Sequence, residues 1–217
     1  MATRRTRVGM LADLEAERLE LADVLDTLGP CEWAADSLCP AWTVHELVAH
    51  LTLSNRSPVM ATVLAMVRAR GDFDRVEADA ARERARCYSP AELVDQLRET
   101  AGLDRKFPLA GTLDPLVDIL VHGQDIVRPL GRSRVMPVER VVPALEQVWK
   151  SPFLGLSKRF AEIRFVATDA GWSRGEGAHE LRGRAGELLL VSTGRPAGLA
   201  ELHGPALADV SARLTPA

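Results

Sequence analysis

One histidine of the sequence has the same helical spacing as the apolar residues around it. In the segment that begins at Thr43, Leu47, His50 and Leu51 follow one another at steps of three and four residues. Residues at this spacing share one side of a helix, so we expect His50 on the buried side. An imidazole there must be hydrogen-bonded or bound to a metal, because burying it unpaired is costly. Taken alone, the pattern favours a hydrogen-bonded core histidine.

A second set of polar residues has the spacing of one helix face. Asp118 and His122 are separated by four residues, and Asp125 follows His122 by three. Two histidines and a carboxylate from two helices can form a three-ligand metal site with an open position. A water molecule or a substrate thiol can take that position. The alternative for Asp118 and His122 is a surface pair that stabilises the helix by roughly 0.2–0.5 kcal/mol.

Other reactive side chains have simpler explanations. Arg128, near the end of the same helix, could bind a substrate carboxylate or complement the helix dipole. Cys39 and Cys87 are expected to be small buried apolar residues rather than redox thiols. The three cysteines of the chain include no Cys-x-x-Cys pair, which argues against a disulfide framework and a four-cysteine zinc site.

The elements that would position these side chains are mostly helices. Thr43–Glu46 and Ser89–Glu92 have the pattern of capping boxes, in which the side chains at both ends satisfy free backbone N–H groups. Proline at Ser57-Pro58 is expected to interrupt or kink the second helix. Helices are predicted over residues 10–28, from Thr43, over Val59–Arg70, from Ser89, from Asp114 to before Pro129, and from Pro137 with Pro143 inside.

The pattern changes after residue 150. Glu162–Thr168 is rich in apolar and β-branched residues and predicts a strand, and His179–Arg182 predicts a second, shorter one. Ala185–Ser192 predicts a helix that ends before Gly194. The sequence therefore predicts a helical domain over residues 1–150 and a small α+β domain over residues 151–217.

Composition excludes several classes of function. The chain has 217 residues, a net charge of −3 and 5% aromatic residues, so neither a basic nucleic-acid surface nor a stacking platform for single strands is expected. No signal peptide or membrane-spanning run is visible, and we expect a soluble, cytoplasmic protein without membrane partners. Only three of the 27 basic residues are lysines, which is typical of a GC-rich genome.

Several motifs together resemble one family. Cys39–Leu51 (CPAWTVHELVAHL) resembles the start of the second helix in the mycothiol-dependent maleylpyruvate isomerase family, a branch of the DinB-like helical bundles. Val121–Gly131 is similar to that family's third-helix motif. Three later segments resemble, in the same order, parts of the family's small C-terminal domain: Phe165–Trp172, Gly194–Pro196 and Leu202–Gly204.

This resemblance implies a fold and a metal site. The fold would be a DinB-like up-and-down four-helix bundle followed by a small α+β domain. In the family a divalent metal, typically zinc, is held by residues that correspond to His50, Asp118 and His122. Better-known members have glutamate where this chain has Asp118, which is one methylene shorter. The position before Trp42, often glycine in the family, is Ala41 here.

The resemblance also implies thiol chemistry. The cosubstrate would be mycothiol, the low-molecular-weight thiol of actinobacteria, and a zinc ion would deprotonate its sulfur. The implied activity is that of an isomerase or a thiol S-transferase acting on a small electrophile. From its spacing alone, Asp125 is expected either to orient a ligating histidine or to be a surface acid near the end of its helix. The alternative is a non-catalytic member without metal that binds a small ligand or a protein, and the sequence leaves a monomer and a homodimer equally open.

Overall fold

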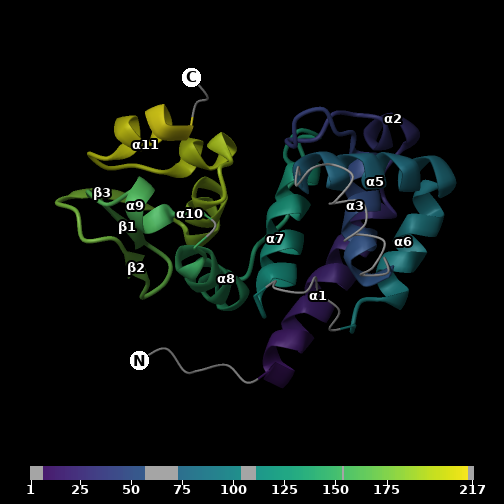
Figure 1. The fold of residues 1–217 in the computed structure, drawn as a ribbon, viewed down its shortest axis with the longest axis horizontal. Coiled ribbons are helices and arrows are strands. Elements are labelled where there is room, and N and C mark those ends of the chain that lie inside the picture. Colours follow the sequence, from purple (N-terminus) through teal and green to yellow (C-terminus); the bar gives the residue numbers. More distant parts are fainter. Residues whose placement is uncertain (1–6, 57–72, 104–110, 153, 215–217) are drawn as a thin grey trace. The chain divides into compact units, whose positions relative to one another are not determined.

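The computed structural model describes residues 7–56, 73–103, 111–152 and 154–214 (Figure 1). By its contacts the chain divides into two compact units, Met1–Arg134 and Val135–Ala217. No helix within the described ranges is long and apolar enough to cross a membrane. The break predicted at Ser57-Pro58 and the helix predicted over Val59–Arg70 lie outside the described residues.

The first unit is a bundle of helices around α3. Its long helices pack through apolar faces: α3 contacts α5, α6 and α7, and α1 contacts α6 and α7 (Figure 1). Leu21, Leu47, Leu93 and Leu120 are fully buried between them. The helices are α1 (Arg7–Leu25), α2 (Pro30–Trp33), α3 (Val44–Arg56), α5 (Phe73–Cys87), α6 (Pro90–Glu99) and α7 (Asp114–Val127).

Capping boxes begin two of these helices, as predicted. At α3, the backbone N–H of Thr43 donates to Glu46 Oε2 at 2.9 Å and that of Glu46 to Thr43 Oγ1 at 3.2 Å. At α6, the N–H of Ser89 donates to Glu92 Oε2 at 2.7 Å, and the serine hydroxyl accepts in return. Each pair satisfies backbone donors that a helix start leaves free, and so fixes where the helix begins.

The second unit is a small sheet with helices. It consists of α8 (Val138–Lys150), α9 (Leu156–Arg159), β1 (Ile163–Ala167), β2 (Ser173–Arg174), β3 (His179–Gly183), α10 (Ala185–Ser192), the 3₁₀-helix η1 (Pro196–Glu201) and α11 (Leu207–Leu214). In the sheet order β2-β1-β3, β1 pairs antiparallel with β2 and parallel with β3. Alternate residues of β1, among them the fully buried Phe165, face the core, where Trp149 meets Phe165 with ring centroids 5.0 Å apart.

The predicted fold class is confirmed, since a helical bundle precedes a small unit of helices and strands. Pro143 lies inside α8 without ending it. The contacts divide the chain after Arg134 rather than near residue 150, because α8 packs against α10 of the second unit. That residues 1–150 and 151–217 are independent domains stays a prediction.

Candidate metal centre

Helix α7 presents three polar side chains along one side. Asp118, His122 and Asp125 are separated by four and three residues, and most of the remaining face of α7 is apolar and buried. Asp125 is completely buried, His122 is 14% exposed and Asp118 is 35% exposed. Exposure therefore increases along these three side chains, from the buried Asp125 to the partly exposed Asp118.

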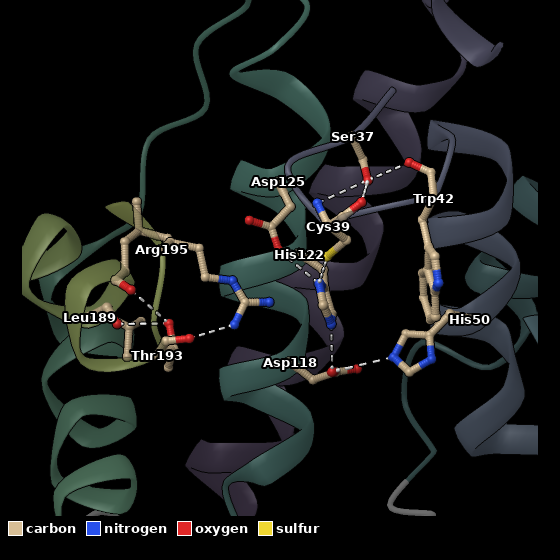
Figure 2. A network of polar contacts seen from close by, with 11 residues as sticks. Ser37, Cys39, Trp42, His50, Asp118, His122, Asp125, Leu189, Thr193 and Arg195 are labelled. Carbon is tan, nitrogen blue, oxygen red and sulfur yellow. Dashed lines mark hydrogen bonds and ion pairs between the residues drawn. The ribbon is translucent and has the colours of Figure 1, made fainter. Parts of the chain in front are cut away.

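Helix α3 brings His50 to the same place (Figure 2). His50 Nε2 lies 3.6 Å from Asp118 Oδ1, and His122 Nε2 lies 3.3 Å from the same oxygen. The two imidazole rings meet edge to face with centroids 5.2 Å apart. Two nitrogens from two helices and one carboxylate oxygen thus lie within 4.8 Å of one another.

The separations around Asp118 are close to those between two ligands of one bound ion. A tetrahedral ion with bonds of about 2.0–2.1 Å to nitrogen and oxygen separates two of its ligand atoms by about 3.3–3.4 Å. A charge-assisted N–H···O bond is shorter, at about 2.7–2.9 Å. The 3.3 and 3.6 Å separations around Asp118 are close to the first value, whereas the 2.9 Å between His122 Nδ1 and Asp125 Oδ2 matches the second.

The protonation of His122 follows from its two carboxylate neighbours. Asp125 accepts hydrogen bonds, so Nδ1 carries a proton and Nε2 faces Asp118. Burial lowers the pKa of His122, but the charge of Asp118 and hydrogen bonds with Asp118, Asp125 and Cys39 outweigh it and raise the pKa well above its ordinary value. A cation bound at Nε2 would take the place of the second proton and leave the first on Nδ1.

Asp118 is the acidic partner of both rings. Burial raises the pKa of its carboxyl, but the charge and hydrogen bond of His122, followed by those of His50, outweigh burial and hold the pKa well below its ordinary range. Its charge is therefore present across the physiological range. Nδ1 of His50 is buried and has no hydrogen-bond partner among the described residues, so Nε2 is the only ring nitrogen of His50 that contacts the group.

The comparisons with known proteins agree with the resemblance. Residues 14–108 match the family profile of the mycothiol maleylpyruvate isomerase N-terminal domain. Over this range the chain is similar to the N-terminal domain of that family. A search among curated proteins finds no relative. The matched range includes His50 and ends before Asp118 and His122.

Two solved structures are similar to this chain over nearly its whole length. A crystal structure of the mycothiol-dependent maleylpyruvate isomerase is 14% identical with a TM-score of 0.49. A crystal structure of a histidine-to-alanine mutant of that isomerase is 13% identical with a TM-score of 0.52. Each comparison covers 93% of this chain and 94% of the other chain. At this identity the second likeness establishes a common fold.

The departures from the isomerase family have structural consequences. The short side chain of Asp118 reaches both histidines, so the missing methylene does not remove the carboxylate from the group. Ala41 adopts a φ of +62°, the left-handed region that glycine occupies without strain. Glycine at this position would adopt the same backbone conformation without strain.

The remaining predicted residues are found in different surroundings. Asp125 lies against His122 as expected for an orienting carboxylate, and that role stays a prediction. Arg128 is the C-cap residue that follows α7, and its Nε donates to Gln124 Oε1 at 2.9 Å. Cys87 was expected to be buried and is exposed, because it ends α5 on the surface of the helix.

Sequence reasoning missed two contacts of the loop before α3. Cys39 Sγ donates to Asp125 Oδ2 at 3.3 Å and lies 3.5 Å from His122 Nδ1 (Figure 2). The Trp42 ring lies against the His50 ring with centroids 5.2 Å apart. Cys39 and His122 are 83 residues apart, so no local spacing could have revealed their contact.

Proposed function

We propose that the chain is a metal-dependent enzyme that uses mycothiol to isomerise a small electrophile or to transfer a thiol to it. The observation that carries this proposal is the placement of Asp118 Oδ1 at 3.3 and 3.6 Å from the Nε2 atoms of His122 and His50. Three ligands of this kind leave further positions of a divalent ion open to a substrate. Zinc is the metal we propose, because two imidazoles and a carboxylate are ligands it commonly takes in catalytic sites.

A bound divalent ion would supply a Lewis acid that favours the deprotonated form of a thiol beside it. Two neutral imidazoles and one carboxylate would leave the centre with net positive charge, which favours an anionic sulfur. The chain's own residues prepare this site: Asp118 provides the single negative charge that faces both rings. Asp125 holds the Nδ1 proton of His122 and so keeps Nε2 directed at Asp118.

Mycothiol enters the proposal through the family whose N-terminal domain profile matches residues 14–108. A free thiol with a pKa near about 8.5 is mostly protonated at neutral pH, so a thiol-using enzyme benefits from a metal that activates the sulfur. The partners would be a small-molecule thiol and a small electrophile. The cytoplasm is the compartment we propose, because thiols stay reduced there.

Metal content tests the proposal first. The full chain, purified without a metal-binding tag, should contain about one divalent ion per chain, and His50→Ala should lose it. His45→Ala is the matched control, because His45 lies on the same helix with its Nε2 within 3.0 Å of the Tyr88 carbonyl oxygen. A wild-type chain that takes up no metal even with added zinc would contradict the enzyme and favour the non-catalytic binding protein.

Turnover is the second test. The zinc-loaded chain should convert electrophiles, beginning with maleylpyruvate, only when mycothiol is present, and His50→Ala should be inactive with the fold intact. Activity that is equal with and without mycothiol would contradict the proposed cosubstrate while leaving the metal site in place.

A further inference from the structure

One loop of the first unit touches both candidate histidine ligands. The segment Ser37–Trp42 connects α2 to α3, and it presents Cys39 to His122 and Trp42 to His50 (Figure 2). Neither side chain belongs to the three-ligand group. The loop therefore contacts both imidazole rings without supplying any of the three candidate ligand atoms.

The sulfur of Cys39 completes a triangle of polar atoms. His122 Nδ1 lies 2.9 Å from Asp125 Oδ2, Cys39 Sγ donates to the same oxygen at 3.3 Å, and Sγ lies 3.5 Å from Nδ1. Asp125 is completely buried, and a buried carboxylate requires hydrogen-bond donors. The thiol and the imidazole are thus two donors to one interior oxygen, and each limits the movement of the other.

The backbone of the loop fixes the sulfur. Ser37 Oγ accepts from the Cys39 N–H at 3.1 Å and donates to the Trp42 carbonyl at 2.8 Å. The N–H of Leu38 donates to the backbone carbonyl of Asp125 at 3.0 Å, which ties the loop to α7 at the residue the thiol contacts. Hydrogen bonds therefore fix the backbone of Cys39 and tie its neighbour Leu38 to the backbone of Asp125. With both backbones fixed, the thiol can keep a defined contact with the Asp125 carboxylate.

We propose that Cys39 is a positioning residue for His122: its thiol and the Asp125 carboxylate together hold the imidazole so that Nε2 faces Asp118 and His50. The thiol lies at the Nδ1 edge of the ring, whereas Asp118 lies at the Nε2 edge, so Cys39 acts through the ring. The effect on metal binding rests on the proposed function, whereas the positioning itself rests on the hydrogen bonds among Cys39, His122 and Asp125.

A separate metal site is the competing interpretation of the same residues. Cys39, His122 and Asp125 hold ligand atoms within 4.8 Å of one another. An ion between Nδ1 and Oδ2 would separate them by about 3.3–3.4 Å. The observed 2.9 Å is the length of a charge-assisted hydrogen bond, so a proton shared by His122 and Asp125 fits the distance better.

The test compares Cys39→Ala, which removes the donor, with Cys39→Ser, which keeps one, in the full chain. Cys31→Ala is the matched control, because Cys31 is an exposed free cysteine in the same unit. The zinc affinity is measured by competition with a chromophoric chelator, and the geometry by the visible absorption of the cobalt-loaded chain. Proton NMR of the metal-free chain follows the imidazole N–H of His122.

We expect Cys39→Ala to weaken zinc binding about 10–100-fold, to shift the cobalt bands and to lose the His122 N–H signal to exchange with water. Cys39→Ser should restore most of the affinity and the signal, and Cys31→Ala should match the wild type. Wild-type affinity and signal in Cys39→Ala would overturn the inference, as would a serine variant that behaves like alanine. Loss of a second equivalent of zinc would identify the sulfur as a ligand and also overturn it.

If the wild type binds no metal, the proposed function fails while the inference is still decided. The His122 N–H signal is then the readout, since the hydrogen bonds to Asp125 are made by the chain's own side chains. A signal that persists unchanged in Cys39→Ala would overturn the positioning role. A signal lost in alanine and recovered in serine would support it.

Discussion

Oδ1 of Asp118 lies 3.3 Å from Nε2 of His122, one helical turn further along α7. The pair alone would be an ordinary contact on a helix surface, but His50 of α3 approaches the same oxygen at 3.6 Å. A carboxylate between two ring nitrogens concentrates negative charge where a cation would bind. Zinc binding by Asp118 can be measured separately from its contribution to the stability of the fold.

Asp118→Asn should weaken zinc binding by more than the roughly 10–100-fold that outer partners of a metal site contribute, because it removes a ligand charge. The metal-free chain should lose some stability, because Asp118 lies beside both rings, but solvent screens this loss since the side chain is 35% exposed. The measurements are a zinc titration and thermal unfolding after chelation. Asp114→Asn, at the start of the same helix, is the control, and equal zinc affinity in both variants would contradict a ligand role for Asp118.

Ala41→Gly should stabilise the first unit. Ala41 has a φ of +62°, and a left-handed conformation costs an L-residue roughly 1–2 kcal/mol. Glycine removes this strain but loses about 0.4–1 kcal/mol through a more flexible unfolded chain. We expect a net gain of some tenths of a kcal/mol up to about 1 kcal/mol in chemical unfolding. A clear loss of stability would contradict the strain, and Ala34→Gly at a right-handed position (φ −88°) should be destabilising.

The local parts of the site were predictable from the sequence, and the long-range parts were not. Helical spacing alone placed Asp118, His122 and Asp125 on one side of α7, because i, i+4 and i+7 positions share a face. The capping box at Thr43 set the start of α3 and so the inward direction of His50. That the two helices meet at these side chains came only from the family resemblance.

The loop before α3 has no such pattern. Its shape depends on hydrogen bonds of Ser37 and Leu38 and on the left-handed Ala41, none of which produces a period in the sequence. Cys39 was therefore expected to be a simple apolar residue. The same limit explains Cys87: an expectation of burial based on residue type fails where α5 ends at the surface.

Gly123→Ala should destabilise the first unit although alanine favours helices. A Cβ at Gly123 would lie 2.9 Å from Arg134 Nη1, and the Arg134 side chain is 4% exposed and paired with the fully buried Glu17. Alanine gains about 1 kcal/mol in helix propensity, whereas overpacking beside a buried ion pair costs about 1–3 kcal/mol. We expect a net loss in chemical unfolding. Gly171→Ala, whose Cβ would meet open space, is the control, and an equal or higher stability of Gly123→Ala would show that the guanidinium moves aside.

Glu146 should make the second unit sensitive to acid. Its Oε1 accepts from Trp172 Nε1 at 2.9 Å, and its Oε2 pairs with Arg174 and Lys150. Burial raises the pKa of Glu146, but the hydrogen bond and charge of Arg174, with Lys150 and Trp172, outweigh it and lower the pKa below the ordinary 4.5. Because the folded pKa lies below the unfolded one, this stabilisation is fully present above pH 4.5 and is lost as the pH falls through the folded pKa.

Glu146→Gln should therefore lower the stability at pH 7 by about 1 kcal/mol and have progressively less effect as the pH falls below 4.5. Urea unfolding followed by tryptophan fluorescence measures both, because Trp172 lies in the second unit and contacts residue 146 directly. Glu139→Gln, at the exposed start of α8, is the matched control and should leave the acid dependence unchanged. A difference between wild type and Glu146→Gln that stays constant from pH 7 to pH 3 would show that the carboxylate charge does not stabilise this contact.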